Sequence, residues 1–164
     1  MRTYAEPVCL CLDVYVWIPG RSSEIFRQFI DTYVDVDDPG DERFHTFTRV
    51  HVLGITSDTD AQALDDLRRA DGDDAFTLYL RARDHYGAII TITRDGATVL
   101  GLSIEAPDDL PETLKLAEQL MKQLRQQFSA PAGCAGVELP PAGDRSEWYD
   151  EGLVLLRMGE LPAP

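Results

Sequence analysis

The sequence predicts an α+β fold: a mixed, largely antiparallel sheet with two main helices packed on it. Apolar residues alternate over several short segments bounded by turn residues, which indicates strands. Two longer segments, about 23–34 and 110–128, carry apolar residues at helical spacing instead. Three predicted strands follow one another over 76–105 with no helix between them, which indicates a β-meander.

Length and composition predict one domain. The chain has 164 residues, of which 44% are hydrophobic, so a sizeable core can form. Because no Pro/Ser-rich linker divides it, residues 1–164 are expected to fold as a single acidic domain.

The first strand is predicted over residues 8–18. Its sequence, "VCLCLDVYVWI", is apolar on both faces except for Asp13, so this strand is expected inside the sheet and covered on both sides. A Pro-Gly pair ends it. Ser22 or Ser23 can then cap the first main helix, at about 23–34.

The next segment, "FHTFTRVHVLG" at residues 44–54, is predicted as a second strand. One of its faces carries His45, Arg49 and His51 as a polar stripe, which is typical of a half-solvated sheet. A short helix is expected over 60–69.

The meander is predicted as strands over 76–83, 86–94 and 97–105. Asp95-Gly96 joins the last two of them and is a strong signal for a tight hairpin. The sequence therefore predicts antiparallel pairing for this region.

The second main helix is predicted over 110–128, with Pro111 in its first turn and a broad apolar stripe. A short strand near 135–139 and a final strand over 152–158 complete the expected order of elements.

The charge is unusual, because 29 acidic residues against 15 Lys and Arg give a formal net charge of −14. Such a chain is not expected to bind nucleic acid, whose phosphates need clustered Lys and Arg, or an anionic membrane surface. The favoured partner is a basic protein. Six acids fall in residues 31–42 and seven in residues 58–74. These connections lie at the surface, where acids either carry function or serve solubility alone.

The cysteines and the apolar runs predict a reduced, cytoplasmic protein. Three cysteines are an odd number, and Cys9 and Cys11 lie too far apart along one strand for an easy disulfide. The apolar run over 8–18 has no small-residue cleavage site, so no signal peptide is expected. No segment has the roughly 18 apolar residues of a membrane span.

The acidic stretch "DVDDPGDE", residues 35–42, fails as a calcium loop. Such a loop needs oxygen ligands at fixed positions and a bidentate Glu at position twelve. Counted from Asp35, position five is Pro39 and position twelve is Thr46, and neither supplies a carboxylate. No metal site is expected there.

No catalytic set is visible in the sequence. On one strand, His45 and His51 would lie about 20 Å apart and could not share a metal ion. Asp13 has two interpretations: a functional carboxylate with a raised pKa, or a structural residue that lies near a strand bulge or pairs with an arginine. Cys/His ligand spacings and phosphate-binding glycine loops do not occur, so neither enzymatic activity nor a cofactor is expected.

The aromatic pair Trp148-Tyr149 lies in a charged segment and has two interpretations. It is either an anchor that closes the core beneath a loop or a recognition site, for which Trp and Tyr are enriched.

With these features, the chain resembles the small, acidic immunity proteins that accompany bacterial polymorphic toxins. The resemblance is one of format: a short α+β domain with acidic loops and no visible catalytic set. It implies that acidic clusters dock onto a basic toxin domain and block its active site. Under this hypothesis, the residues expected to contact the partner are Asp35, Asp37, Asp38, Asp41, Glu42, Asp71, Asp73, Asp74, Trp148 and Tyr149.

Two other classes of function stay open. The first is a small enzyme or ligand-binding protein that uses the face of His45, Arg49 and His51 together with Asp13. The second is a housekeeping subunit that forms a homodimer through an uncovered sheet face. The expected oligomeric state is a monomer or a weak homodimer.

Overall fold

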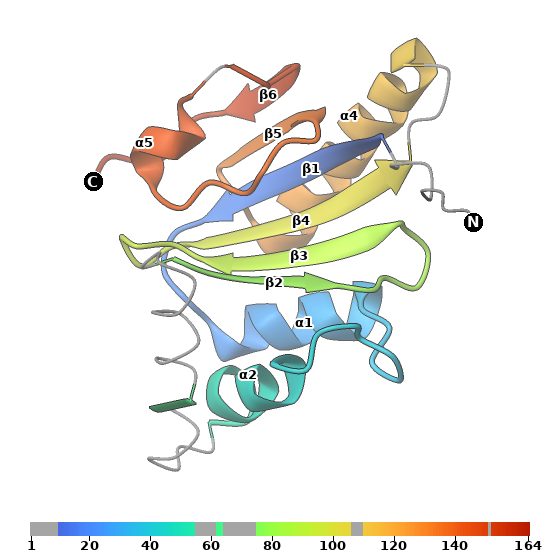
Figure 1. Cartoon of the computed structure of the whole chain (residues 1–164). Helices are drawn as coiled ribbons and strands as arrows, with labels where there is room; N and C mark the ends of the chain where they lie inside the picture. Colours follow the sequence, from blue (N-terminus) through green and yellow to red (C-terminus); the bar gives the residue numbers. More distant parts are fainter. Residues whose placement is uncertain (1–9, 55–61, 64–74, 106–109, 151) are drawn as a thin grey trace, which may run out of the picture.

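The structure is a computed structural model and describes residues 10–54, 62–63, 75–105, 110–150 and 152–164. These residues form an α+β fold with a single six-stranded sheet, as predicted (Figure 1). In chain order the elements are β1 (Cys11–Ile18), α1 (Ser23–Tyr33), α2 (Phe44–His51), β2 (Phe76–Leu80), β3 (Gly87–Ile92), β4 (Thr98–Glu105), α4 (Leu110–Phe128), β5 (Ala132–Val137), α5 (Arg145–Trp148) and β6 (Leu156–Gly159).

The strand order in the sheet is β2-β3-β4-β1-β5-β6, and every pairing is antiparallel. The predicted meander is confirmed as β2, β3 and β4. Its predicted hairpin is confirmed as well: Gly96 has a φ of 82°, and the Thr93 amide donates to the Ala97 carbonyl at 2.9 Å. The positive φ explains the preference for glycine at this position.

Strand β1 lies between β4 and β5, and all eight of its residues are buried, so the prediction of a covered inner strand is confirmed. Its alternating side chains define two faces of the sheet. The helical face carries Leu12, Val14, Val16 and Ile18, which pack with α1, α2 and α4. The second face carries Asp13, Tyr15 and Trp17.

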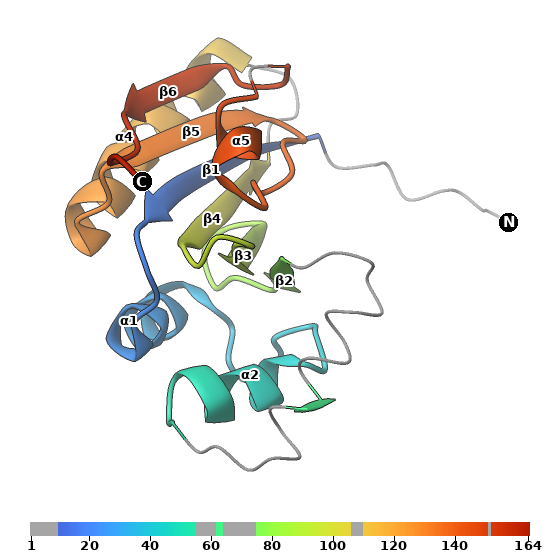
Figure 2. The same ribbon diagram turned by 90° about the vertical axis from the view of Figure 1, so that its left-hand side faces the viewer.

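The two faces are covered unequally. Helices α1 and α4 lie on one side of the sheet and the short α5 lies on the other (Figure 2). Trp17 on the second face packs with Trp148 and Leu161 from the C-terminal region. That region covers β1 and β5 at one end of the second face, and the functional candidates lie at the other end.

The predicted strand over 44–54 is wrong, because Phe44–His51 forms helix α2. Phe44, Phe47 and His51 follow at helical spacing, and in a run this short the helical and strand patterns overlap. Long-range contacts favour the helix over the strand, because Phe47 packs against Phe26 of α1 and Phe76 of β2. The helix turns this aromatic face toward the core.

Other differences concern boundaries. Ser22 caps α1, and its side chain accepts a hydrogen bond from the Ile25 amide at 3.4 Å. Strand β5 begins before the predicted 135–139, and β6 is shorter than the predicted 152–158. The helix α5, capped by Asp144, was not predicted. Apart from residues 62–63, the predicted helix over 60–69 lies outside the described residues.

Candidate functional site

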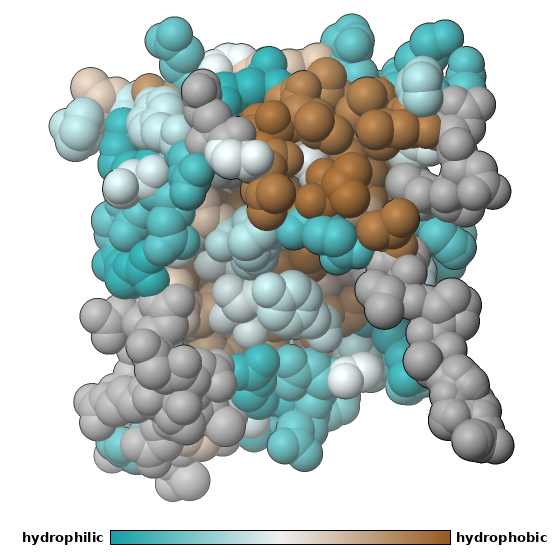
Figure 3. All heavy atoms as spheres, turned by 45° about the horizontal axis from the view of Figure 1, so that its top comes forward, coloured by the Kyte–Doolittle hydropathy of each residue, from teal (hydrophilic) through white to brown (hydrophobic). Residues whose placement is uncertain are grey.

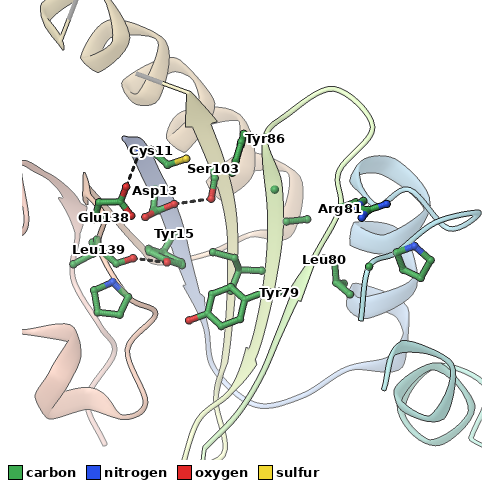
Figure 4. A pocket seen from close by; sticks show the side chains of 16 residues that line it. Cys11, Asp13, Tyr15, Tyr79, Leu80, Arg81, Tyr86, Ser103, Glu138 and Leu139 are labelled. Carbon is green, nitrogen blue, oxygen red and sulfur yellow. Dashed lines mark hydrogen bonds between the residues drawn. The ribbon is translucent and has the colours of Figure 1, made fainter. Parts of the chain in front are cut away.

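A pocket of about 730 Å³ opens on the second face of the sheet (Figure 4). Strands β1, β2, β3 and β4 contribute to it, together with the acidic stretch and the segment after β5. The lining residues used below are Asp13, Tyr15, Tyr79, Tyr86, Ser103 and Glu138. The site therefore joins residues that are far apart in the sequence.

Small residues around Asp13 create the space. On the neighbouring strands, Asp13 lies opposite Ser103 and Gly136, and Ser103 lies opposite Gly87. Side chains directly opposite each other in an antiparallel pair share one face. The small residues Ser103 and Gly87 therefore leave space beside Asp13 on the side of β4 and β3, whereas the Leu153 backbone covers Gly136 on the side of β5.

Tyr15 forms part of the floor. A Cβ atom on Gly101 would lie 2.5 Å from Cδ1 of Tyr15, so only glycine lets the aromatic ring lie across β4. The Tyr15 hydroxyl donates to the Leu139 carbonyl at 2.6 Å. This bond ties the segment after β5 to the sheet and shapes one wall of the pocket.

Asp13 is the buried carboxylate of the pocket, with 7% of its surface exposed. Burial raises its pKa to about 6 and the charge of Glu138 adds to the rise, whereas the hydrogen bonds from Ser103 and the Leu139 backbone lower it. The Ser103 hydroxyl donates to Oδ1 at 2.6 Å. Among the described residues, no Lys or Arg forms an ion pair with Asp13, so the predicted pairing with an arginine is not found there.

Glu138 places a second carboxylate beside Asp13. Its φ is 51°, a left-handed conformation that is uncommon for a residue other than glycine. Its amide donates to the Cys11 carbonyl at 2.9 Å, and its Oε1 accepts from the Cys11 amide at 3.2 Å. These two bonds hold an otherwise exposed side chain at the edge of the pocket.

Tyr79 and Tyr86 supply aromatic surface, and each is 59% exposed. Figure 4 shows the Tyr79 ring reaching from β2 across the sheet face. Partial burial raises the pKa of Tyr79, and the charge of Asp13 adds to the rise. The tyrosine and the carboxylate therefore lie close enough to interact.

The acidic stretch 35–42 borders the pocket through Pro39 and Gly40. It is tied to the end of β2, because the Arg81 amide donates to the Pro39 carbonyl and the Asp35 amide to the Arg81 carbonyl, each at 2.8 Å. The stretch thus has a defined position beside the sheet.

Two of the predicted contact residues in this stretch form ion pairs within the chain. Asp38 pairs with Arg81, and Asp41 pairs with Arg43 at 2.9 Å. Asp37 and Glu42 are exposed, while Asp35 is half-buried. The arginines come from outside the acidic stretch, so its charge is more compensated than the local sequence indicates.

The structure separates Trp148 from Tyr149. Trp148 is 3% exposed and packs edge-to-face on Trp17, with ring centroids 5.7 Å apart, so its side chain is a core anchor. Tyr149 is half-exposed. Asp71, Asp73 and Asp74 lie outside the described residues.

His45, Arg49 and His51 do not converge with Asp13. They lie on α2, where His45 is exposed and the His51 ring contacts Phe26 and Phe47. Those two phenylalanines belong to the core of the helical face, whereas Asp13 points to the second face. The predicted polar sheet stripe is therefore replaced by a helix.

Two further observations concern potential metal ligands and the cysteines in the described parts of the chain. No three His, Cys, Asp or Glu side chains gather there as ligands for a metal ion. Cys11 and Cys134 are buried, and burial raises the pKa of Cys134 to about 12, which leaves it a thiol. Cys9 lies outside the described residues.

Comparison with family models, with curated proteins and with solved structures gives no match to this chain. Of the helices that the structure describes, none has the length and apolar character needed to cross a membrane. Function is therefore argued from the chemistry of the site.

Sequence analysis singled out Asp13 and missed the other pocket residues. Gly101 inside a strand was an available signal, because such a glycine often marks close approach of another group. Glu138, Tyr79 and Ser103 carry no local signal, since their role depends on the strand order. Together the residues form a negatively charged, aromatic-walled pocket suited to binding a cation.

Proposed function

We propose that this protein is a toxin-neutralising immunity protein that docks an acidic surface onto a basic protein toxin and blocks its active site. The observation that carries the proposal is the pocket, where Asp13 and Glu138 present two carboxylates and the acidic stretch stands at the border. Two carboxylates at an open surface, neither of them in an ion pair with a Lys or Arg among the described residues, favour a positively charged partner.

Apolar surface beside the pocket supports a protein as the partner. Figure 3 shows a hydrophobic area on this part of the molecule. Leu10, Leu153 and Leu155 are each about half exposed, and the Leu153 backbone lies against Gly136, the residue opposite Asp13. Charged contacts next to exposed leucines and tyrosines are typical of protein interfaces.

The same apolar area favours a second candidate, the homodimeric subunit. Exposed apolar patches mark association sites in general, and a second copy of the chain would also cover the leucines. A homodimer would bring two acidic pockets near each other, however, and like charges oppose such contact. We therefore place the basic partner first.

The test begins with capture of the tagged protein's partner from lysate of the source organism, washed at low and then at high salt. One basic protein retained near one-to-one is then co-expressed with and without this chain. We expect growth arrest by the captured protein alone and rescue by co-expression. A captured protein that is harmless alone, or no basic protein at all, would overturn the proposal.

Charge variants sharpen the test. Replacing Asp37 and Glu42 together by Asn and Gln removes two exposed acids beside the pocket without touching the ion pairs of Asp38 and Asp41. We expect the double variant to associate with the basic partner roughly threefold more slowly at low salt, with little change in the association rate at high salt. The matched control replaces Asp31 and Glu160, which are also exposed, and changes the net charge equally.

A further inference from the structure

We infer that the pocket binds the guanidinium group of one arginine side chain presented by the basic partner. The inference rests on the proposed function, because it assumes a basic protein partner, and it names the contact that this partner makes. Two carboxylates and two tyrosine rings that line the pocket carry the argument.

Asp13 supplies the ionic contact at the base of the pocket. Its Oδ1 accepts from Ser103, which orients the carboxylate, and no Lys or Arg in the described residues neutralises it. Burial of a carboxylate is costly unless a cation or hydrogen bonds compensate it. An incoming cation would supply the missing compensation.

Glu138 supplies a second acceptor beside Asp13 (Figure 4). Its Oε1 accepts the Cys11 amide, so the side chain is positioned before any ligand arrives. A guanidinium has five N–H donors in a rigid fork and can serve two carboxylates at once. A lysine ammonium is a compact, strongly hydrated charge and gains less from this arrangement.

Tyr79 and Tyr86 supply the walls. Both rings are exposed and both line the pocket. Cations are attracted to the faces of tyrosine rings, and the planar guanidinium also stacks on them. This combination of aromatic faces and carboxylates favours arginine over lysine.

Arg81 is the one cation among the described residues that line the pocket. Its guanidinium pairs with Asp38, and its backbone joins β2 to the acidic stretch. Its charge is therefore largely compensated, and it does not cancel the two carboxylates on the other side of the pocket.

The direct test uses peptides with the full-length, ¹⁵N-labelled protein at pH 7.5. The probes are acetyl-Gly-Arg-Gly-amide and its lysine and citrulline counterparts, of which citrulline keeps the shape and lacks the charge. We expect saturable shifts of the amide signals of Tyr15, Gly101 and Ser103 with the arginine peptide. The lysine peptide should bind roughly threefold more weakly and the citrulline peptide at least about tenfold more weakly.

Variants locate the binding. Asp13→Asn should weaken binding of the arginine peptide about tenfold, while the control Asp31→Asn, which replaces an exposed acid of α1, should change it less than about twofold. Tyr79→Ala should weaken binding of the arginine peptide roughly fivefold. Tyr149→Ala should have no effect on it, because Tyr149 is similarly exposed but follows the C-terminal end of α5. Unfolding curves confirm that each variant folds.

Two results overturn the inference: an arginine peptide whose dissociation constant exceeds about 10 mM, or equal binding of the arginine and citrulline peptides. A captured toxin that binds the Asp13→Asn and Tyr79→Ala variants as tightly as the unchanged protein overturns it as well, and leaves the proposed function standing. Saturable arginine binding without a toxic partner supports the pocket and overturns the proposed function instead.

Discussion

The two ends of the second sheet face use the same strands and differ in packing. Trp17 and Asp13 lie on β1 four residues apart and point to the same face. Trp17 stands opposite Val99 and Ala132 and is capped by Trp148, whereas Asp13 stands opposite Ser103 and Gly136. Large apolar side chains close one end of the face. Small residues and a carboxylate leave the other end open.

This difference shows how one sheet serves two purposes. The closed end buries aromatic surface, which is the main source of stability. The open end holds a carboxylate whose burial disfavours the charged form, and so it reduces stability at neutral pH. Proteins retain such destabilising groups at functional sites, where binding compensates for them.

The largest expected effect is on stability and comes from replacing Trp148, which closes one end of the second sheet face. Trp148→Ala should lower the free energy of unfolding by about 3–5 kcal/mol, because it removes the buried aromatic ring that packs on Trp17. Urea unfolding followed by circular dichroism measures the change. Tyr149→Ala next to it should cost far less, and equal losses for the two variants would contradict the assigned packing.

The second largest effect on stability comes from removing the charge of Asp13 at the open end of this face. Asp13 has its pKa raised from 3.8 to about 6, so the folded state holds a proton that the unfolded state releases between these values. The contribution of Asp13 to stability is therefore most favourable below pH 4, falls as the pH rises to about 6, and stays lower above it. The loss at pH 7 is about 3 kcal/mol.

Asp13→Asn should remove this loss and increase stability at pH 7 by up to about 3 kcal/mol, with a flatter profile between pH 4 and 6. Urea unfolding at several pH values in that range measures it. A variant that is less stable than the unchanged protein at pH 7 would show that the carboxylate has a stabilising partner.

A smaller effect is expected at the floor of the pocket. Gly101→Ala places a Cβ atom 2.5 Å from the Tyr15 ring, so the ring must move, at a cost of about 1–3 kcal/mol. Thermal unfolding gives the cost. The matched control is Gly87→Ala, because a Cβ atom at this position would make only ordinary contacts. Gly20→Ala would not serve, because Gly20 has a positive φ that disfavours alanine. Equal costs would argue against the close approach of Tyr15.

The smallest expected effect is that of one hydrogen bond. Tyr15→Phe removes the donor to the Leu139 carbonyl and should cost about 1 kcal/mol while it keeps the ring over Gly101. Because the bond holds the wall that contains Glu138, hydrogen exchange of the Glu138 and Leu139 amides should become faster. Unchanged exchange would show that other contacts hold this segment.

Local patterns in the sequence determined the α+β class, the meander and the covered position of β1. They did so because periodicity and the Asp95-Gly96 turn act within a few residues of the chain. Asp13 was identified for a similar reason: a single charge in an apolar strand is visible without knowledge of its neighbours.

Only the tertiary structure decided the rest. Helix α2 replaced a predicted strand because Phe47 packs between α1 and β2. Arg81 reaches Asp38, an acid that the local sequence left uncompensated. The pocket itself depends on the strand order β2-β3-β4-β1-β5, which places Tyr79, Ser103, Asp13 and Glu138 on one face. Contacts between residues so distant in sequence arise from packing, and no local pattern encodes them.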